Sequence, residues 1–207
     1  MSLKIKTKFI FLALFPYFIL YFLLQSILVI NTNYNLATDL DRLIPFIPEF
    51  IWIYHTIIPV FFLTLAIIIE RKSVFWTAIV ATVMAYILML SFYAVFPAFY
   101  PRDGFTATSI SGFLVELTRS IDASNNTFPS GHVTFAWLLV CFIGLSEIAK
   151  KHKWVQFVYI LWAFLISIST VVLKQHFLVD VFSGISLAVL CYFLAKHLVY
   201  ERILITN

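Results

Sequence analysis

Charged residues are scarce in this sequence of 207 residues. They make up 12% of the chain, whereas apolar side chains make up 62% and the mean hydropathy is +0.99. A soluble domain carries about one quarter charged residues, so this composition excludes one. The sequence is that of an integral membrane protein.

Cysteine is also rare. Cys141 and Cys191 are the two cysteines, and they fall inside separate apolar runs without CxxC spacing. We expect buried apolar side chains rather than metal ligands or a redox pair. The chain further lacks internal repeats and a run of basic residues of the kind that binds nucleic acid, so its pI of about 9.1 needs another explanation.

Long apolar runs are what the sequence contains instead. A membrane-spanning helix needs about 20 predominantly apolar residues. The runs of this length lie at about residues 9–30, 50–69, 74–96, 130–149, 154–173 and 177–195. We therefore predict an all-α fold with a single domain, residues 1–207, built as a polytopic membrane bundle of six transmembrane helices. The first run is too long for a signal peptide and lacks a cleavage site, so we expect it to be retained.

Basic residues gather on one side of these predicted spans. Ten lysines and arginines with three acids fall on the side that holds both chain ends, and four with seven acids fall on the other side. Cytoplasmic loops carry the excess of Lys and Arg. We therefore predict a multi-pass protein of the plasma or inner membrane with both termini in the cytoplasm, and the high pI then reflects this topology.

Polar residues gather at the opposite, extracytoplasmic ends of the predicted helices. Four helix ends present them at similar depth: Arg102, Ser130, Gly131, His132, Lys174, His176 and Asp180. Ionisable groups near lipid are costly and usually functional. We therefore predict that these residues form one site.

The start of the fourth run has the features of an anion site. Pro129 suits a first helical turn, and the N–H groups after it point outward at the positive end of the helix. Gly131 lets a ligand approach the backbone, as at other helix N-termini that bind anions. Arg102 and Lys174 would add positive charge, which suits a phosphate group.

Two histidines at this site could have different tasks. His176 and Asp180 are four residues apart, which places them on one face of a helix. The aspartate can accept a hydrogen bond from one ring nitrogen of His176 and leave the other nitrogen free as a nucleophile. His132 can protonate a leaving oxygen.

The motifs resemble those of the type 2 phosphatidic acid phosphatase superfamily, which also includes vanadium-dependent haloperoxidases and lipid phosphotransferases. "PSGH" is followed about forty residues later by His-x-x-x-Asp, with a Pro-Arg pair upstream. The resemblance covers about residues 95–195, and the six-span layout agrees with it. It implies hydrolysis that needs no metal and no cofactor.

The resemblance also implies a role for each matching residue. His176 would form a phosphohistidine, Asp180 would orient it, and His132 would be the general acid. Ser130 and Gly131 would bind phosphate oxygens.

Two departures from the family pattern concern positive charge. The family's first motif usually has a lysine seven residues before an Arg-Pro pair, where this chain has Val95 and the reversed order Pro101-Arg102. The third motif usually has Ser-Arg where this chain has Ser169-Thr170. Two cations of the family pattern are therefore absent.

Lys174 is the candidate substitute for the missing arginine. It lies four residues after Thr170, so it would share a helix face with that position if residues 169–175 are helical. Variants of this kind resemble the branch that contains inositol phosphorylceramide and sphingomyelin synthases, where the acceptor is a lipid alcohol.

Three functions remain open at this stage. The leading hypothesis is a lipid phosphatase acting at the extracytoplasmic face on phosphatidate, a phosphatidylglycerol phosphate or a polyprenyl diphosphate. Its expected partner is a membrane lipid, and we expect it to bind no nucleic acid. The second is a lipid phosphotransferase. The third is a non-catalytic transporter or scaffold.

Other polar residues near the predicted site receive ordinary interpretations. Arg119 and Asp122 are expected to be solvated loop charges. His55 is expected to be an interfacial polar residue, and Tyr54 fits an interfacial aromatic belt together with Trp52.

Overall fold

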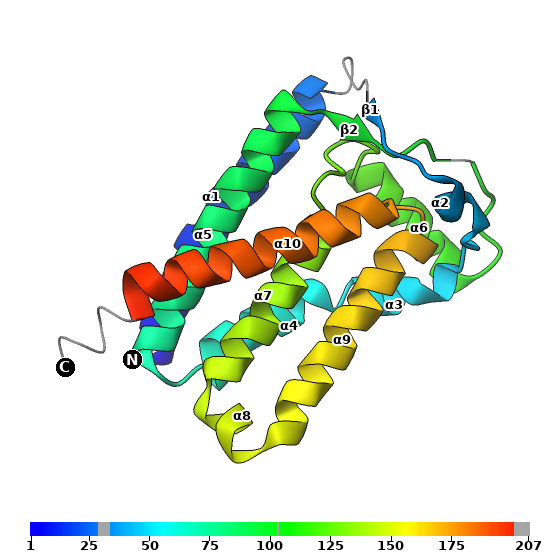
Figure 1. Ribbon diagram of the computed structural model, residues 1–207. Helices are drawn as coiled ribbons and strands as arrows, with labels where there is room; N and C mark the ends of the chain where they lie inside the picture. The colour runs from blue at the N-terminus through cyan, green and yellow to red at the C-terminus, as the bar shows by residue number, and fades with distance from the viewer. Residues whose placement is uncertain (29–33, 103, 201–207) are drawn as a thin grey trace.

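Long apolar helices make up most of the protein, and several short elements, β1, β2, α2 and α6, gather at one end of them (Figure 1). The computed structural model describes residues 1–28, 34–102 and 104–200. The long helices are α1 (Leu3–Leu28), α5 (Lys72–Val95), α9 (Lys153–Val172) and α10 (Leu178–Ala195). The shorter elements are β1 (Tyr34–Asn35), α2 (Asp39–Leu43), η1 (Pro48–Phe50), α3 (Ile51–Tyr54), α4 (Ile57–Leu63), η2 (Thr64–Ile68), β2 (Ala98–Phe99), α6 (Ile110–Ile121), α7 (Gly131–Leu145), α8 (Glu147–Lys151) and η3 (Lys196–Tyr200).

Within the described residues, five helices are long and apolar enough to cross a membrane. They are Leu3–Ile27, Pro48–Ile68, Lys72–Val95, Lys153–Val172 and Leu178–Val199. The all-α, multi-pass membrane fold is thus confirmed, with five candidate spans and one shorter apolar helix.

The shorter helix is α7, where we expected a run over about residues 130–149. Its 15 residues correspond to about 22 Å, less than the roughly 30 Å of a hydrocarbon core. It ends because Ser146 adopts an extended conformation, and the Ser146 hydroxyl then accepts a hydrogen bond from the Ala149 N–H to begin α8. Six spans therefore stay a prediction.

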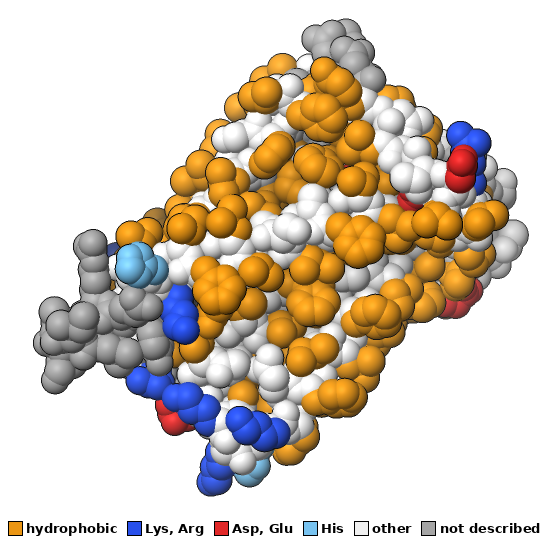
Figure 2. All heavy atoms as spheres, viewed as in Figure 1, with side chains coloured by type: hydrophobic (Ala, Val, Ile, Leu, Met, Phe, Trp, Pro, Cys, Tyr) orange, Lys and Arg blue, Asp and Glu red, His pale blue; other side chains and the backbone are white. Residues whose placement is uncertain are grey.

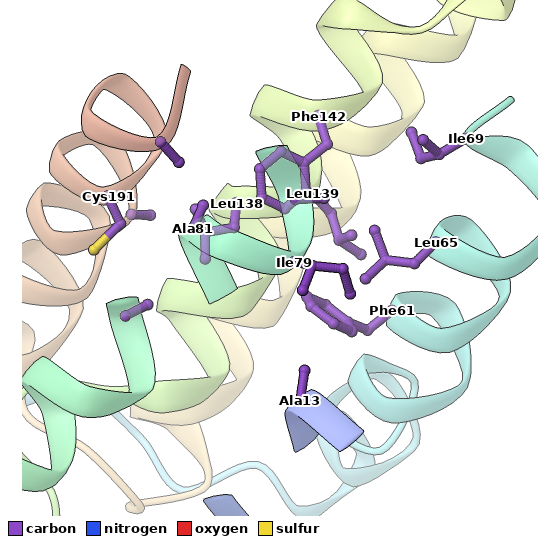
Figure 3. Packing of buried hydrophobic residues seen from close by; sticks show 14 of the residues in the cluster. Ala13, Phe61, Leu65, Ile69, Ile79, Ala81, Leu138, Leu139, Phe142 and Cys191 are labelled. Carbon is purple, nitrogen blue, oxygen red and sulfur yellow. The ribbon is translucent and has the colours of Figure 1, made fainter. Parts of the chain in front are cut away.

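Helix α7 lies inside the bundle and packs against α5, α9 and α10. Figure 3 shows Leu138, Leu139 and Phe142 of α7 among buried side chains from neighbouring helices. Cys191 belongs to this core and is fully buried, as predicted, whereas Cys141 is half-buried.

The two ends of the bundle differ in charge. In Figure 2 apolar side chains cover the middle of the visible face, and most of the visible lysine and arginine side chains gather at one end. Glu147 accepts contacts from Arg71 and Lys150 at 3.0 and 3.1 Å there. Helix α1 begins and α10 finishes at that same end (Figure 1). Its location in the cytoplasm stays a prediction from the charge asymmetry.

The opposite end carries a cap made by the two long connections. A two-residue parallel pairing joins β1 to β2, with Tyr34 opposite Ala98 and Asn35 opposite Phe99. The second connection also contains α6, a helix that we did not predict, capped by the Ser109 hydroxyl on the Gly112 N–H. Helix α6 is too short and too polar to resemble a membrane span. It covers one side of the cavity described below.

Candidate active site

A cavity of about 320 Å³ lies at the capped end, between α1, α3, α4, α6 and the first turn of α7. Its polar wall includes His55, Arg102, Asp122, His132, Gln175 and His176. Its apolar wall includes Leu14, Phe18, Phe22, Ile58, Phe62 and Leu117. Arg102, Gly131, His132 and His176, four of the seven predicted site residues, thus line one cavity.

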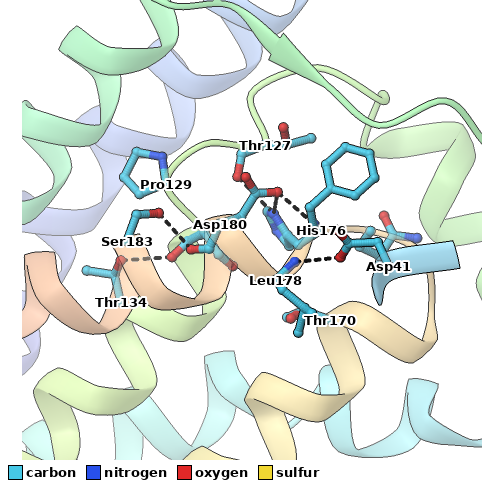
Figure 4. A network of polar contacts seen from close by, with 12 residues as sticks. Asp41, Thr127, Pro129, Thr134, Thr170, His176, Leu178, Asp180 and Ser183 are labelled. Carbon is cyan, nitrogen blue, oxygen red and sulfur yellow. Dashed lines mark hydrogen bonds and ion pairs between the residues drawn. The ribbon is translucent and has the colours of Figure 1, made fainter. Parts of the chain in front are cut away.

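His176 lies in the turn between α9 and α10. Its ring Nδ1 is 2.8 Å from the carbonyl oxygen of Thr127 and 3.4 Å from Oδ2 of Asp180 (Figure 4). Because a carbonyl can only accept, Nδ1 carries the proton when the ring is neutral and Nε2 keeps its lone pair. Thr127, which the sequence did not reveal as a partner, therefore sets the tautomer.

Asp180 is completely buried in the first turn of α10. Its Oδ2 accepts a hydrogen bond from the backbone N–H of Phe177 at 2.9 Å, so the carboxylate closes the start of the helix. The expectation that His176 and Asp180 share a helix face is corrected, because α10 begins at Leu178 and His176 lies outside it. The two groups nevertheless lie close together, because the hydrogen bond from the Phe177 N–H to Asp180 holds the turn that contains His176 against the start of α10.

Helix α7 begins at Gly131, so Pro129, which we had placed in the first helical turn, lies outside the helix, and the first turn brings His132 to the cavity. The His132 ring stacks on the ring of Tyr54, with centroids 4.0 Å apart and planes inclined by 22°. A side chain at Gly131 would meet the Tyr17 hydroxyl at 3.2 Å. The glycine therefore serves the packing of α1 against α7 as well as any ligand.

Ser130, the residue before α7, is fully buried and is not part of the cavity wall. Its N–H donates to the Asp180 carbonyl at 3.1 Å, so this amide is occupied by α10. The close approach requires Gly184, where a Cβ would stand 2.8 Å from the Ser130 carbonyl oxygen. Of the predicted cradle, the amides of Gly131 and His132 remain in the first turn, where α-helical N–H groups lack intrahelical acceptors.

Arg102 is fixed on the cavity wall by three acceptors. Its guanidinium donates to the carbonyls of Asp122 and Ala123 and to the side-chain oxygen of Gln175, the last at 2.6 Å. The Arg102 Nε has no hydrogen-bond partner in the described part of the chain. One donor of this cation therefore remains for a ligand.

Lys174 does not lie at the cavity. The helical premise for residues 169–175 is wrong, because α9 ends at Val172 and Lys174 adopts a left-handed conformation with φ 56°. This turn lets the N–H groups of Gln175 and His176 reach the Thr170 carbonyl. The Lys174 ammonium instead donates to the carbonyls of Asp41 and Ile44.

The Lys174 side chain therefore links segments of the cap and does not contribute to the first cavity. Asp41 completes this link, since its Oδ1 accepts from the Leu178 N–H at 2.8 Å at the start of α10 (Figure 4). Lys174 lines a second cavity, of about 520 Å³, together with Arg42 and Arg119.

Three residues that we had interpreted as ordinary belong to the first cavity. Nε2 of His55 lies 2.9 Å from the hydroxyl oxygen of Thr118. Asp122, expected to be solvated, is half-buried and accepts a 2.6 Å hydrogen bond from the Tyr21 hydroxyl. Burial raises the pKa of the Asp122 carboxyl. The ring of Tyr54 stacks on that of His132. All three line the same cavity as the predicted residues Arg102, Gly131, His132 and His176.

Arg119 was also expected to be solvated. Its guanidinium instead lies over the rings of Phe46 and Phe105, at 5.2 and 5.1 Å from their centroids, and donates to the Leu173 carbonyl. It therefore belongs to the packing of the cap.

Several buried polar atoms at the first cavity have no hydrogen-bond partner among the described residues. They are the Tyr54 hydroxyl, Arg102 Nε, Gln175 Nε2 and the Thr127 hydroxyl. Buried polar atoms are nearly always paired in folded proteins. Four residues of the cavity wall therefore carry a buried polar atom that could accept a further partner.

The PAP2 superfamily model matches residues 92–204 of the chain, more than half of its length. The chain belongs to the PAP2 superfamily. Its fold is similar to the crystal structure of Aquifex aeolicus LpxE, with a TM-score of 0.52, 18% sequence identity, and coverage of 78% of this chain and 88% of that chain. A comparison with curated protein sequences finds no match.

The two departures from the usual PAP2 motifs leave the cavity with little positive charge. Val95 ends α5 with its side chain 82% exposed, and Thr170 is fully buried with its hydroxyl on the Ser167 carbonyl. Among the described residues on the cavity wall, Arg102 is the one lysine or arginine. No group of three or more His, Cys, Asp or Glu that could hold a metal ion occurs in the described ranges.

Proposed function

We propose that this PAP2 protein is a lipid phosphatase that removes phosphate from a phosphomonoester or diphosphate of a membrane lipid. The observation that carries the proposal is the meeting of His132 and His176 at one cavity, beside unpaired donors and next to an apolar wall. The active site would face the extracytoplasmic side, in keeping with the charge asymmetry of the chain.

The nucleophile in this proposal is Nε2 of His176. The contact of Nδ1 with the Thr127 carbonyl keeps the proton on Nδ1, so the lone pair of Nε2 is available to attack phosphorus. A phosphorus–nitrogen bond forms as the bond to the lipid oxygen breaks. The nearby Asp180 carboxylate stabilises the positive charge that develops on the ring.

His132 has the role of acid and then base. Its protonated ring gives a proton to the departing lipid oxygen, and its neutral ring then accepts a proton from the attacking water. Water adds to phosphorus, the phosphorus–nitrogen bond breaks, and His176 regains its lone pair as phosphate leaves. The stack on Tyr54 limits rotation of the His132 ring during both steps.

Phosphate binding in this proposal combines one cation with helix-terminal amides. Arg102 keeps its Nε free on the cavity wall. The amides of Gly131 and His132 lie at the positive end of α7, where anions are stabilised.

The lipid part of the substrate would enter from the side. Phe18, Phe22, Ile58 and Leu117 line the cavity and are also exposed on the apolar flank of the bundle, by 38 to 60%. Such a wall is continuous with the hydrocarbon region, so a lipid can keep its chains in the bilayer while its headgroup reaches the histidines.

The test is release of inorganic phosphate by the purified protein from a panel of lipid phosphates. We would use phosphatidate, a phosphatidylglycerol phosphate and a polyprenyl diphosphate, with His176→Ala as the inactive control. Release by the wild type and not by the variant supports the proposal. Equal release by both, or none from any substrate, contradicts it.

A lipid phosphotransferase is the second candidate. The observation that favours it is Asp122, a half-buried carboxylate on the cavity wall that can accept a hydrogen bond from an acceptor alcohol. Adding diacylglycerol or ceramide to the same assay distinguishes the two, because transfer yields a new phospholipid instead of inorganic phosphate.

A further inference from the structure

We propose that Tyr54 is a further catalytic residue of this site, whose phenolic hydroxyl donates a hydrogen bond to a non-bridging oxygen of the reacting phosphoryl group. The inference rests on the proposed phosphoryl-transfer function and assigns to it a donor outside the motifs that the chain shares with its superfamily.

The position of Tyr54 is rigidly determined. It ends α3, and its side chain is 2% exposed. The ring packs with Ile51, Val115 and Leu173 on one side of the cap and stacks on His132 at 4.0 Å. A ring that is buried in this cluster and stacked on His132 keeps its hydroxyl in one place without a hydrogen bond.

That hydroxyl has no partner in the described chain although it is buried at the cavity. Two other tyrosines on the same wall provide a contrast. Tyr21 donates to Asp122 at 2.6 Å, and Tyr93 donates to the Pro129 carbonyl at 2.9 Å. Leaving a buried hydroxyl unpaired is unfavourable, so its retention beside His132 indicates that a bound group supplies the acceptor.

The cavity has little positive charge to stabilise a phosphoryl group, so a further donor would be useful there. Val95 and Thr170 stand where the superfamily usually has cations, and Lys174 is held in the cap. Arg102 alone among the described lysines and arginines lines the cavity. A rigid neutral donor aimed at the position of developing charge is effective in a site from which water is excluded, so Tyr54 can offset part of the missing positive charge.

The experiment compares Tyr54→Phe with Tyr86→Phe. The first variant keeps the ring that stacks on His132 and removes the hydroxyl. The control removes a hydroxyl from a tyrosine that packs on Tyr17, with centroids 5.7 Å apart, and lies outside the cavity wall. For each protein we would measure kcat and KM with a short-chain phosphatidate, the inhibition constant of orthovanadate, and the thermal unfolding temperature with and without orthovanadate.

We expect kcat/KM of Tyr54→Phe to fall by about 10², the lower end for loss of one preorganised donor, and the orthovanadate inhibition constant to rise in the same variant. The unfolding temperature without ligand should stay the same or rise, because an unpaired buried hydroxyl is removed. A merely structural role would lower stability and leave orthovanadate binding unchanged. Tyr86→Phe should stay within about twofold of wild type in every measurement.

Tyr54→Phe within about twofold of wild type in both turnover and orthovanadate binding would overturn the proposal. If the wild type releases no phosphate from any lipid, the proposed function fails, and the shift of unfolding temperature by orthovanadate still decides whether Tyr54 binds an oxyanion.

Discussion

The imidazole of His132 lies flat against the phenol ring of Tyr54, with centroids 4.0 Å apart and planes inclined by 22°. Tyr54 comes from α3 and His132 from the first turn of α7, 78 positions further along the chain. The contact joins the candidate span Pro48–Ile68 to α7 at the cavity. His132 and His176 line that same cavity.

The first prediction concerns the nucleophile. Brief incubation with a phosphorus-labelled lipid phosphate should label the protein on His176, because the Thr127 carbonyl leaves Nε2 of that ring unprotonated. The label should be acid-labile and alkali-stable, as phosphoramidates are, and mass spectrometry of peptides locates it. Label on Ser130, whose buried hydroxyl also lacks a partner in the described chain, would disprove the assignment.

The second prediction concerns His132 as the acid. His132→Ala should slow turnover of lipid phosphates far more than that of activated aryl phosphates, since only a poor leaving group needs a proton. General acid catalysis contributes about 10² to 10⁴ in rate, so the difference between the two substrate classes should approach the lower value. Equal losses in kcat for both classes would mean that His132 has a structural role.

The third prediction concerns the charge on Asp122. Burial raises the pKa of its carboxyl in the folded protein above the value in the unfolded chain, so the carboxyl is stabilising when protonated and that contribution is lost as pH rises through the folded-state pKa. Asp122→Asn should therefore unfold at a higher temperature than wild type at pH 7, by about 2–4 °C for each kcal/mol.

The advantage of the asparagine should shrink as the pH falls from the folded-state pKa toward about 4, because below that pH the wild-type carboxyl is neutral in both states. Thermal unfolding in detergent between pH 4 and pH 8 measures it. Lower stability of the variant at pH 7 would mean that the Tyr21 and Arg102 interactions outweigh the cost of burial.

The fourth prediction concerns Lys174. Because its ammonium binds carbonyls of the cap and not the cavity, Lys174→Ala should keep turnover within a few-fold of wild type and lower the unfolding temperature. Lys174→Gly loses the same hydrogen bonds but relieves the left-handed backbone, so it should be more stable than the alanine variant by about 1 kcal/mol. If kcat fell by about 10² in both variants while the unfolding temperature stayed unchanged, Lys174 would have to act at the active site.

The fifth prediction concerns topology. In a protein with Cys141 and Cys191 replaced by alanine, single cysteines at Leu40 and Ser124 should react with an impermeant thiol reagent from outside the cell. Cysteines at Lys72 and Lys151 should react only after the membrane is opened. The reverse pattern would place the cavity at the cytoplasmic face.

The sequence by itself determined the class of the protein and the superfamily to which it belongs. The shortage of charge and the long apolar runs predicted an all-α membrane fold, which is confirmed, because lipid admits few other structures for such segments. The meeting of His132 with His176 at one cavity followed from ionisable residues at predicted helix ends. The start of α7 was predicted only approximately, because Pro129, expected in the first turn, lies before the helix.

Only the tertiary structure decided which other groups reach the cavity. Lys174 is turned away by one left-handed residue, and Ser130 has its amide occupied by α10. Tyr54 and Asp122 are brought in by α3 and by the end of α6. Their placement depends on contacts between segments far apart in the sequence, such as Asp41 with Leu178, because the direction of a side chain at a helix end is set by whichever distant segment packs against that end.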